Sequence, residues 1–478
     1  MLQRTKFFID GAWVSPITPR EVEVINPATE QAFATISMGS KEDVDAAVAA
    51  ARLAFRSWSI TSKAERLDWL SSIQAAYDRR MPDIAAAISQ EMGAPISLSQ
   101  SAQAPVGAFH MAGIIQALEK FDFEHDFGPS GDGNRIHHEP IGVCGLITPW
   151  NWPMNQVTLK VLPALAAGCT VLLKPSEVAP ISSMVFAEVI EEAGLPAGVF
   201  NLVNGDGATV GEAMSSHPDI DMMSFTGSTR AGIAVATGAA RTVKRVTLEL
   251  GGKSPNLIFA DCDVKAAVER GVMTCFQNSG QSCDAPTRML VERSVYSDAV
   301  KFAAAFAEAV KVGDPAESGD HIGPLANSVQ FTKVQSMIVT GIEEGARLIA
   351  GGTGRPDNLT RGYYVKPTIF ADVAPEMTIA REEIFGPVLI MMPFDDEEHA
   401  IEMANDTPYG LAAYVQTDST ERLRRVTRQL RAGMVHANGA YLGAGMPFGG
   451  YKQSGLGREG GRWGIEDFLE IKAVTGWK

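Results

Sequence analysis

Cysteines are few and widely spaced in this chain of 478 residues, and no C-x-x-C pair occurs. The five are Cys144, Cys169, Cys262, Cys275 and Cys283. This spacing indicates neither a thiolate zinc site nor a disulfide framework. The histidines are scattered and form no H-E-x-x-H motif, so we expect no metal site.

Long hydrophobic runs and an excess of positive charge are also missing. No segment reaches the roughly 18 consecutive apolar residues of a membrane-spanning helix. Arg4, Lys6 and Asp10 interrupt the start of the chain, where a signal peptide would be apolar. The net charge of −15 argues against a nucleic-acid partner, because phosphate binding needs a basic surface. We therefore expect a cytoplasmic protein that binds neither membranes nor nucleic acid.

The composition that remains is that of a globular protein, with 45% hydrophobic and 20% charged residues. The length predicts two or three domains. Residues 41–120 have mostly helical periodicity, and from about residue 140 short apolar strands alternate with helix-length segments. A second alternating set begins after Gly251-Gly252. The alternation predicts an α/β fold with parallel, doubly wound sheets.

Residues 121–140, "FDFEHDFGPSGDGNRIHHEP", fit neither alternating set. The Gly-Pro-Ser-Gly-Asp-Gly core predicts a hairpin that projects from the body. The tail "GIEDFLEIKAVTGWK" is a candidate strand partner for it, because it also lies outside the main sheets. His137 and His138 are adjacent in the hairpin, so they point to opposite faces of a strand and are interpreted as structural.

Cys283 stands in "NSGQSCDAPTR", residues 278–288. A free cysteine is usually a small buried hydrophobe, but the neighbours here are polar, and Gly280 allows a sharp turn. Residues 278–288 alone do not decide whether Cys283 is a core thiol or a nucleophile.

Three turns that contain glycine or proline follow predicted strands, and doubly wound proteins bind ligands at such strand ends. In "TPWNWP" (148–153), two prolines hold Asn151, whose amide can donate to an oxyanion; a plain turn with buried aromatics fits equally. In "KPSE" (174–177), a Lys and a Glu suit ribose hydroxyls, or form a solvated pair. In "FTGSTRAG" (225–232), the glycines allow a pyrophosphate to approach, although the G-x-G-x-x-G spacing is not met.

Glu249, in "LELGGKSP" (248–255), ends a predicted strand beside two glycines. A carboxylate there is costly unless it is paired or used, and partial burial would make it a general base. A salt bridge to Lys244 or Arg245 is the structural alternative. P-loop and G-x-S-x-G motifs do not occur. A thiol, an amide donor, a base and a nucleotide-binding sheet together make up the apparatus for oxidising an aldehyde through a thioester.

The ordered set of motifs resembles the NAD(P)-dependent aldehyde dehydrogenase superfamily, in the manner of its bacterial catabolic members. The motifs are "TPWNWP", "KPSE", "FTGST", "LELGGKSP", "NSGQSC", "EEIFGP" (382–387) and "PFGGYKQSGLGRE" (447–459). The resemblance implies a Rossmann-type cofactor domain (1–120 and 141–250) and an α/β catalytic domain (251–455). It also implies a small β oligomerisation element (121–140 and 456–478) in a homodimer or homotetramer.

By the same resemblance, Cys283 would be the nucleophile, Asn151 and the Cys283 N–H the oxyanion hole, and Glu249 the base that activates water. Glu249 favours hydrolysis over transfer to CoA. The implied cofactor contacts are Thr148, Pro149, Trp150, Lys174, Ser176, Glu177, Gly207, Gly227, Ser228, Leu250, Glu383 and Phe385. Glu177 would accept from a 2′-OH and repel a 2′-phosphate, which favours NAD over NADP, with NADP use still open.

The implied substrate contacts are Val106, Trp152, Leu159, Asp284, Leu442 and Phe448. Most are apolar, which suggests an aromatic or medium-chain aliphatic aldehyde, and Asp284 would disfavour an anionic tail near the carbonyl. An acyl-thioester esterase and a non-catalytic dinucleotide-binding protein are the alternatives on the same fold.

Overall fold

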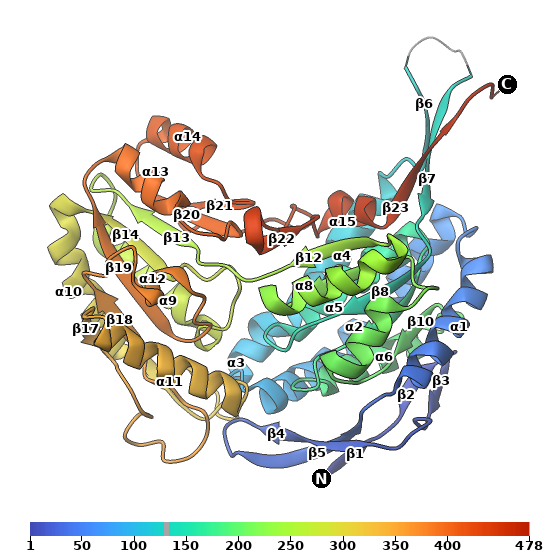
Figure 1. Ribbon diagram of the computed structural model, residues 1–478, viewed down its shortest axis with the longest axis horizontal. Coiled ribbons are helices and arrows are strands. Elements are labelled where there is room, and N and C mark those ends of the chain that lie inside the picture. Colours follow the sequence, from blue (N-terminus) through green and yellow to red (C-terminus); the bar gives the residue numbers. More distant parts are fainter. Residues whose placement is uncertain (129–132, 478) are drawn as a thin grey trace.

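A computed structural model describes residues 1–128 and 133–477 (Figure 1). The centre of the predicted hairpin, residues 129–132, lies outside the described residues. Among those that are described, no helix has the length and apolar character needed to cross a bilayer. Two large sheets with helices on both faces form the body, which confirms the predicted α/β fold.

The first sheet has eight strands in the order β22-β12-β11-β8-β9-β10-β2-β3. Its central strands β12, β11, β8, β9 and β10 are parallel, and the edge strands run antiparallel. The bounds are β2 Phe7–Ile9, β3 Ala12–Val14, β8 Val143–Ile147, β9 Thr170–Lys174, β10 Phe200–Leu202, β11 Met222–Thr226, β12 Arg245–Glu249 and β22 Gly455–Leu456.

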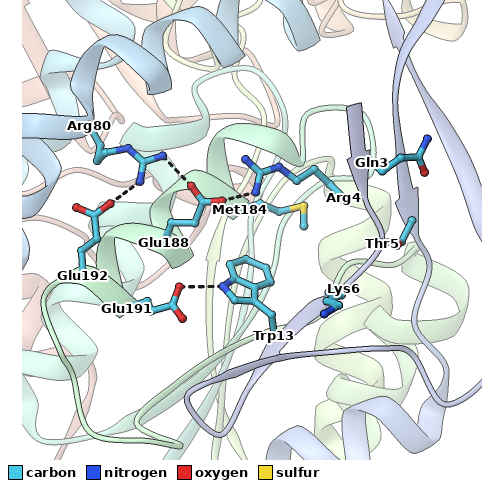
Figure 2. A pocket seen from close by; sticks show the side chains of 10 residues that line it. All are labelled: Gln3, Arg4, Thr5, Lys6, Trp13, Arg80, Met184, Glu188, Glu191 and Glu192. Atoms are coloured by element: carbon cyan, nitrogen blue, oxygen red, sulfur yellow. Dashed lines mark hydrogen bonds and ion pairs between the residues drawn. The ribbon is translucent and has the colours of Figure 1, made fainter. Parts of the chain in front are cut away.

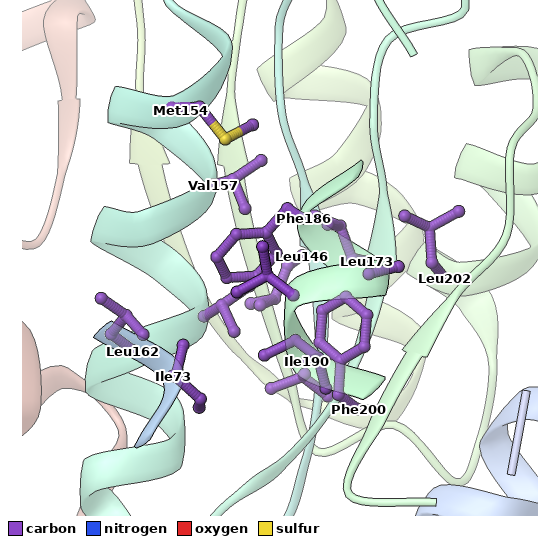
Figure 3. Packing of buried hydrophobic residues seen from close by; sticks show 14 of the residues in the cluster. Ile73, Leu146, Met154, Val157, Leu162, Leu173, Phe186, Ile190, Phe200 and Leu202 are labelled. Carbon is purple, nitrogen blue, oxygen red and sulfur yellow. The ribbon is translucent and has the colours of Figure 1, made fainter. Parts of the chain in front are cut away.

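Both faces of this sheet are buried because successive side chains of a strand point to opposite sides. On β8, Cys144 and Leu146 pack with α2, α5 and α6, whereas Val143 and Ile147 pack with α1, α7 and α8. Figure 3 shows the first of these layers, where Phe186 of α6 lies among strand residues such as Leu146. The helix bounds are α1 Lys41–Trp58, α2 Lys63–Met92, α5 Pro153–Ala167, α6 Ile181–Glu192, α7 Glu212–Ser216 and α8 Thr229–Ala239.

The second sheet has seven strands in the order β17-β18-β19-β14-β13-β20-β21, all parallel except β17. Helices α9 and α10 cover one face, and α11 to α14 cover the other. The strand bounds are β13 Pro255–Ile258, β14 Arg288–Glu292, β17 Arg347–Ala350, β18 Thr368–Ala371, β19 Val388–Phe394, β20 Ala412–Gln416 and β21 Met434–Ala437. The helix bounds are α9 Val264–Phe276, α10 Arg293–Ala309, α11 Ser328–Glu343, α12 Thr378–Arg381, α13 Glu397–Asn405 and α14 Thr420–Gln429.

A three-stranded sheet projects from the body as an arm (Figure 1). Its central strand β7 (Arg135–Pro140) pairs antiparallel with β6 (Glu124–Asp126) and with the tail strand β23 (Leu469–Val474). This pairing confirms the expectation that the tail is the strand partner of segment 121–140. Just before β23, the chain forms α15 (Gly461–Asp467), which packs against α4 (Pro105–Glu119) and α5.

Candidate active site

Cys283 lies where two cavities meet. The turn that carries it follows α9, and the side chain lines both a cavity of about 190 Å³ and a tunnel of about 520 Å³. Cys144, Cys169 and Cys275 are fully buried, whereas Cys283 is half-buried. Its place on two cavities separates Cys283 from these buried thiols and keeps it the candidate nucleophile.

The backbone before Cys283 folds into a tight turn in the left-handed region. Asn278 and Ser279 have φ of 53° and 56°, and Gly280 follows at 72°. A β-carbon at Gly280 would overlap the carbonyl of Gly386, so only glycine fits there. The buried Asn278 amide donates to the carbonyl of Gln281 at 3.2 Å and holds the turn closed.

The surroundings of Cys283 favour the neutral thiol. Burial raises the pKa of Cys283 well above its usual range, and the carboxylates of Asp284, Glu383 and Glu249 raise it further. The thiolate is the nucleophilic form, so reaction requires the proton to be taken away or its loss to be compensated by positive charge.

Asn151 approaches the nucleophile from the other sheet, in the loop between β8 and α5. It is 3% exposed, and its Nδ2 donates to the carbonyl of Gln281 at 3.0 Å. An amide NH₂ has two hydrogens, so this bond fixes the orientation and leaves one donor for a ligand beside Cys283.

Gln103 completes this arrangement and was not predicted from the sequence. It ends a π-helical turn, Ser99–Gln103, and is fully buried. Its Nε2 donates to the Asn151 carbonyl at 3.0 Å and to Asn278 Oδ1 at 3.1 Å. Asn278 Nδ2 also donates to the Asn151 carbonyl, at 2.9 Å. One side chain thus joins the proposed amide donor to the turn that carries the thiol.

Glu249 ends β12 and is 3% exposed, and neither carboxylate oxygen has a hydrogen-bond partner among the described residues. A β-carbon added to Gly449 would lie 2.6 Å from Oε1, so that loop approaches the carboxylate closely. Burial raises the pKa of Glu249 well above its usual range, and Glu459 adds to the effect. This is the electrostatic setting of a general base.

The structural alternative for Glu249 is excluded by the partners of the two cations. Lys244 donates to the carbonyls of Ser215 and His217, at 3.0 and 2.5 Å. Arg245 forms a salt bridge of 2.8 Å with Glu470. Neither neutralises Glu249.

A buried ion pair lies beside Glu249 instead. Lys160 of α5, 1% exposed, donates to Glu459 Oε1 at 2.6 Å and to Ser224 Oγ at 3.2 Å. Lys160 lowers the pKa of Glu249, against burial and Glu459. Glu459 closes the motif "PFGGYKQSGLGRE", but nothing in the sequence indicates that its partner is Lys160.

The smaller cavity brings together ten of the residues that the sequence singled out. They are Pro149, Trp150, Asn151, Gly227, Ser228, Glu249, Leu250, Cys283, Glu383 and Phe385. The rings of Trp150 and Phe385 meet edge to face, with centroids 5.5 Å apart. The backbone N–H of Gly252 donates to Glu383 Oε1 at 2.9 Å, and burial raises the pKa of Glu383. Thr226 Oγ1 is buried there without a partner among the described residues.

Two residues of α11, Gln330 and Lys333, also line this cavity and were missed from the sequence. Gln330 Nε2 donates to the carbonyls of Ile384 and Phe385, at 2.9 and 2.8 Å. Lys333 Nζ donates to the carbonyl of Glu383 at 2.7 Å. These bonds hold the "EEIFGP" turn, in which Phe385 has a φ of 62°.

The other predicted cofactor contacts gather further along the same sheet edge. Lys174 ends β9, is 3% exposed, and donates to the carbonyls of Gly205 at 2.5 Å and Pro175 at 3.0 Å. Its Nζ lies 3.5 Å from the more exposed Glu177. Thr148 donates its backbone N–H to the Lys174 carbonyl, Ser176 accepts from the N–H of Val178, and the space around Gly207 is open.

The tunnel brings Val106, Trp152, Asp284 and Phe448 together with Cys283. Leu159 needs correction: it is 2% exposed within α5 and is absent from the tunnel lining, because its side chain packs into the protein. Leu442 is also absent from that lining and packs in a cluster with Leu411 and Cys283. The lining further includes Phe109, Gln156, Gln277, Tyr414, His436 and Tyr441.

A separate polar pocket of about 510 Å³ lies beside the N-terminal strands (Figure 2). Its charges pair with one another, since Arg80 bridges Glu188 and Glu192, and Arg4 also contacts Glu188. The Trp13 indole N–H donates to Glu191. Among the described residues, no cysteine lines this pocket, so the two cavities at Cys283 are the better candidates for thiol chemistry.

Residues 13–474 match the model of the aldehyde dehydrogenase family. The chain is 55% identical over 474 residues to 3-succinoylsemialdehyde-pyridine dehydrogenase of a Pseudomonas species, covering 99% of this chain and 98% of that protein. An aldehyde dehydrogenase from Bartonella henselae superimposes with a TM-score of 0.98 at 53% identity, with both chains fully covered. A mutant of aldehyde dehydrogenase C from Pseudomonas syringae, in complex with NAD+ and octanal, gives 0.97 at 51% identity, covering 99% and 97%.

Proposed function

The chain belongs to the aldehyde dehydrogenase family, and from that premise we propose that it oxidises an aldehyde to a carboxylic acid with NAD+ and water, through a thioester on Cys283. The observation that carries the proposal is the position of Cys283, whose side chain lines both cavities. A thiol there meets an aldehyde from the tunnel and a cofactor from the smaller cavity.

The smaller cavity fits a nicotinamide riboside. A carboxylate oriented by a backbone N–H, at Glu383, suits ribose hydroxyls, and the unpartnered Thr226 hydroxyl suits a polar ring substituent. Trp150 and Phe385 supply flat apolar walls. When bound, NAD+ accepts a hydride from the substrate carbon.

Lys174, Ser176 and Glu177 would hold the adenosine ribose, with Thr148, Gly207 and the Gly227-Ser228 turn along the route to it. Glu177 has a partly exposed carboxylate at the end of a parallel strand. That carboxylate would accept from a 2′-hydroxyl and repel a 2′-phosphate, so we favour NAD over NADP.

Cys283 would attack the aldehyde carbon as the thiolate. The second hydrogen of Asn151 Nδ2 and the Cys283 backbone N–H would receive the developing oxyanion. Because Asn151 is already fixed by Gln281 and Gln103, its dipole needs no reorganisation when charge develops.

Glu249 would then deprotonate the water that cleaves the thioester and releases the acid. Its unpartnered, desolvated carboxylate supports this role. The buried ion pair of Lys160 and Glu459 acts on its pKa in opposite directions, Lys160 lowering it and Glu459 raising it. A base at this position also favours hydrolysis over transfer of the acyl group to CoA.

For the substrate we propose an aromatic or medium-chain aliphatic aldehyde. Phe109, Trp152, Tyr414, Tyr441 and Phe448 line the tunnel. A tunnel of about 520 Å³ suits a substrate larger than acetaldehyde. Two relatives agree with such a tunnel, since one is named for a pyridine-bearing semialdehyde and the other binds octanal in its crystal structure.

We also propose the division into a cofactor domain, a catalytic domain and an oligomerisation element at the boundaries given above. The arm carries exposed apolar side chains, among them Phe127, Ile471 and Trp477, which support assembly as a homodimer or homotetramer. A monomer in analytical ultracentrifugation would contradict this part.

The experiment for the main proposal follows NADH formation from NAD+ with octanal and an arylacetaldehyde. Cys283→Ala should lower turnover at least about a thousandfold, because Cys283 is the one thiol among the described residues that line the two cavities. Cys275→Ala is the matched control, since that thiol is fully buried on α9 and lines neither cavity. Retained NADH formation in Cys283→Ala would refute the thioester route, whereas ester hydrolysis without NADH formation would favour the esterase alternative.

A further inference from the structure

The tunnel has an unbalanced set of charged groups. Among the described residues that line it there is no lysine and no arginine, and Asp284 supplies the one carboxylate. A substrate that ends in a carboxylate would find no lysine or arginine there to pair with, and burying such a group unpaired is costly.

The Asp284 carboxylate forms no salt bridge within residues 1–128 and 133–477, and a hydrogen bond from its own backbone N–H lowers its pKa. The main-chain carbonyl of Asp284 accepts from the hydroxyl of Tyr414 at 3.1 Å. The side chain is half-buried and directly follows the nucleophile. Burial raises the pKa of Asp284, and His436 acts in the opposite direction.

His436 does not neutralise this carboxylate through a direct contact. Its Nδ1 lies 3.2 Å from the Ala440 carbonyl, which can only accept, so Nδ1 carries a proton there. The imidazole stacks on the ring of Tyr414, with centroids 4.7 Å apart. His436 is 7% exposed, and its Nε2 has no partner among the described residues.

The remaining walls add to the preference for positive charge. Phe109 and Tyr441 are exposed at 42% and 82%, so they are open to an arriving ligand, and Trp152 and Phe448 line the same tunnel. Aromatic rings present a negative face that attracts cations. A single carboxylate surrounded by aromatic rings suits a neutral or cationic tail.

We propose that Asp284 is a specificity-determining residue whose carboxylate admits neutral and positively charged aldehydes and excludes aldehydes that end in a carboxylate. The proposal rests on the proposed function, because it assigns the tunnel to the aldehyde. The selected substrates would carry an uncharged ring or chain, or an ammonium group, at the end away from the carbonyl.

The expected size of the effect follows from Coulomb's law. Two unit charges separated by about 7 Å, at an effective dielectric constant of about 20, interact strongly enough to change a binding ratio by roughly tenfold to fiftyfold. Because Asp284 also raises the pKa of Cys283, its removal changes the rate with every aldehyde. The informative quantity is therefore a ratio between substrates within one variant.

The test measures kcat/KM for three aliphatic aldehydes of similar length, 4-(trimethylammonio)butanal, hexanal and 4-oxobutanoate, with NAD+. In Asp284→Asn, the anionic-to-neutral ratio should rise at least about tenfold and the cationic-to-neutral ratio should fall by a similar factor. Asp357→Asn removes the same charge from a fully exposed side chain outside the tunnel and should leave both ratios unchanged. Unchanged ratios in Asp284→Asn would overturn the proposal.

A second measurement needs no turnover and so separates this proposal from the oxidation itself. Cys283 is modified with two methanethiosulfonates of similar size, one ending in trimethylammonium and one in sulfonate, and the rates are read by intact mass. The Cys283→Ala protein supplies the background from the other thiols. The cationic-to-anionic rate ratio should fall in Asp284→Asn even if no aldehyde is oxidised. An equal ratio in both proteins would refute the charge filter, whereas a shifted ratio without any aldehyde oxidation would refute only the proposed function.

Discussion

The two cavities that meet at Cys283 are built in different ways. The smaller one is lined mainly by residues at or just after the ends of strands, such as Trp150 after β8, Gly227 after β11 and Glu249 at the end of β12. The tunnel is lined largely by side chains from helix surfaces and loops, such as Phe109 of α4 and Tyr441. The reacting groups are therefore set by the sheets, and the substrate is met by elements that pack around them.

This difference has a physical cause in how tightly each region is held. Around the smaller cavity, side chains with several hydrogen bonds fix the turns, as the half-buried Gln330 does for the carbonyls of Ile384 and Phe385. At the tunnel mouth, the side chains of Phe109 and Tyr441 are substantially exposed, so less packing holds them in place than holds buried side chains. Substitutions in the smaller cavity should therefore reduce kcat, and substitutions in the tunnel should change KM or selectivity.

The largest effect in this comparison is expected for Glu249→Gln. An amide cannot accept the proton of water, so thioester hydrolysis should slow by about a hundredfold to ten-thousandfold. Attack by Cys283 and hydride transfer should persist. Rapid mixing should then show a burst of about one NADH per active site, followed by a nearly flat phase.

The role of Glu249 as a base also predicts how the rate of hydrolysis changes with pH. The base works only as the carboxylate, and burial raises its pKa, so hydrolysis in the wild-type enzyme should increase with pH above the ordinary range of glutamate. This increase should vanish in Glu249→Gln. Glu91→Gln is the matched control, because Glu91 is a fully buried carboxylate that accepts from the N–H groups of Ile181 and Ser182, away from both cavities. If the NADH burst itself were lost in Glu249→Gln, Glu249 would act in thiol attack or hydride transfer and not in hydrolysis alone.

A smaller effect is expected for Gln103→Met, which keeps the shape of the side chain but removes its donor. The Asn151 carbonyl and Asn278 Oδ1 would each lose a partner, and the oxyanion donor would be less well oriented. We expect kcat to fall about tenfold with little change in KM, because the interaction is made in the transition state.

A structural role alone would lower stability without this division between kcat and KM. Asn201→Leu provides the comparison: Asn201 is a fully buried amide that donates to the carbonyls of Val171 and Gly198, far along the sheet from Cys283. Both variants should melt at a lower temperature, and only Gln103→Met should lose kcat. An equal loss of kcat in the two would reduce Gln103 to a packing residue.

The sequence predicted the features that local patterns mark and missed the contacts between residues far apart in the chain. The alternation of strands and helices identified both large sheets. The ends of predicted strands identified Asn151 and Glu249 as candidates, and polar neighbours identified Cys283, because these signals lie next to each residue in the sequence. Lys160 was missed, since its partner Glu459 is 299 residues away. Gln103 was missed for the same reason, because Asn278 is 175 residues away and nothing local marks a bond between them.

Leu159 was misplaced because an apolar residue near a strand-end turn has the same pattern whether its helix turns it toward a tunnel or into the core. The short N-terminal strands were also not predicted. β1 (Leu2–Arg4) pairs with β5 (Gln31–Ser37), and β5 with β4 (Glu21–Asn26), in a three-stranded sheet apart from the two large ones. β1 has only three residues and carries too little periodicity to be recognised, whereas β4 and β5, with six and seven residues, were long enough and were overlooked.

The smallest effect is expected at the tunnel mouth, for Phe109→Ala. Its ring is 42% exposed, so a bound octanal chain would cover only part of it, and losing that contact should raise KM for octanal about threefold to tenfold. The ring touches the chain equally before and during the reaction, so kcat should stay near the wild-type value. Acetaldehyde is the internal control, because it is too short to reach from Cys283 to the mouth, and its KM should not change. If kcat for octanal fell instead, the tunnel would position the reacting carbon as well as admit it, and the separation between the two cavities would have to be abandoned.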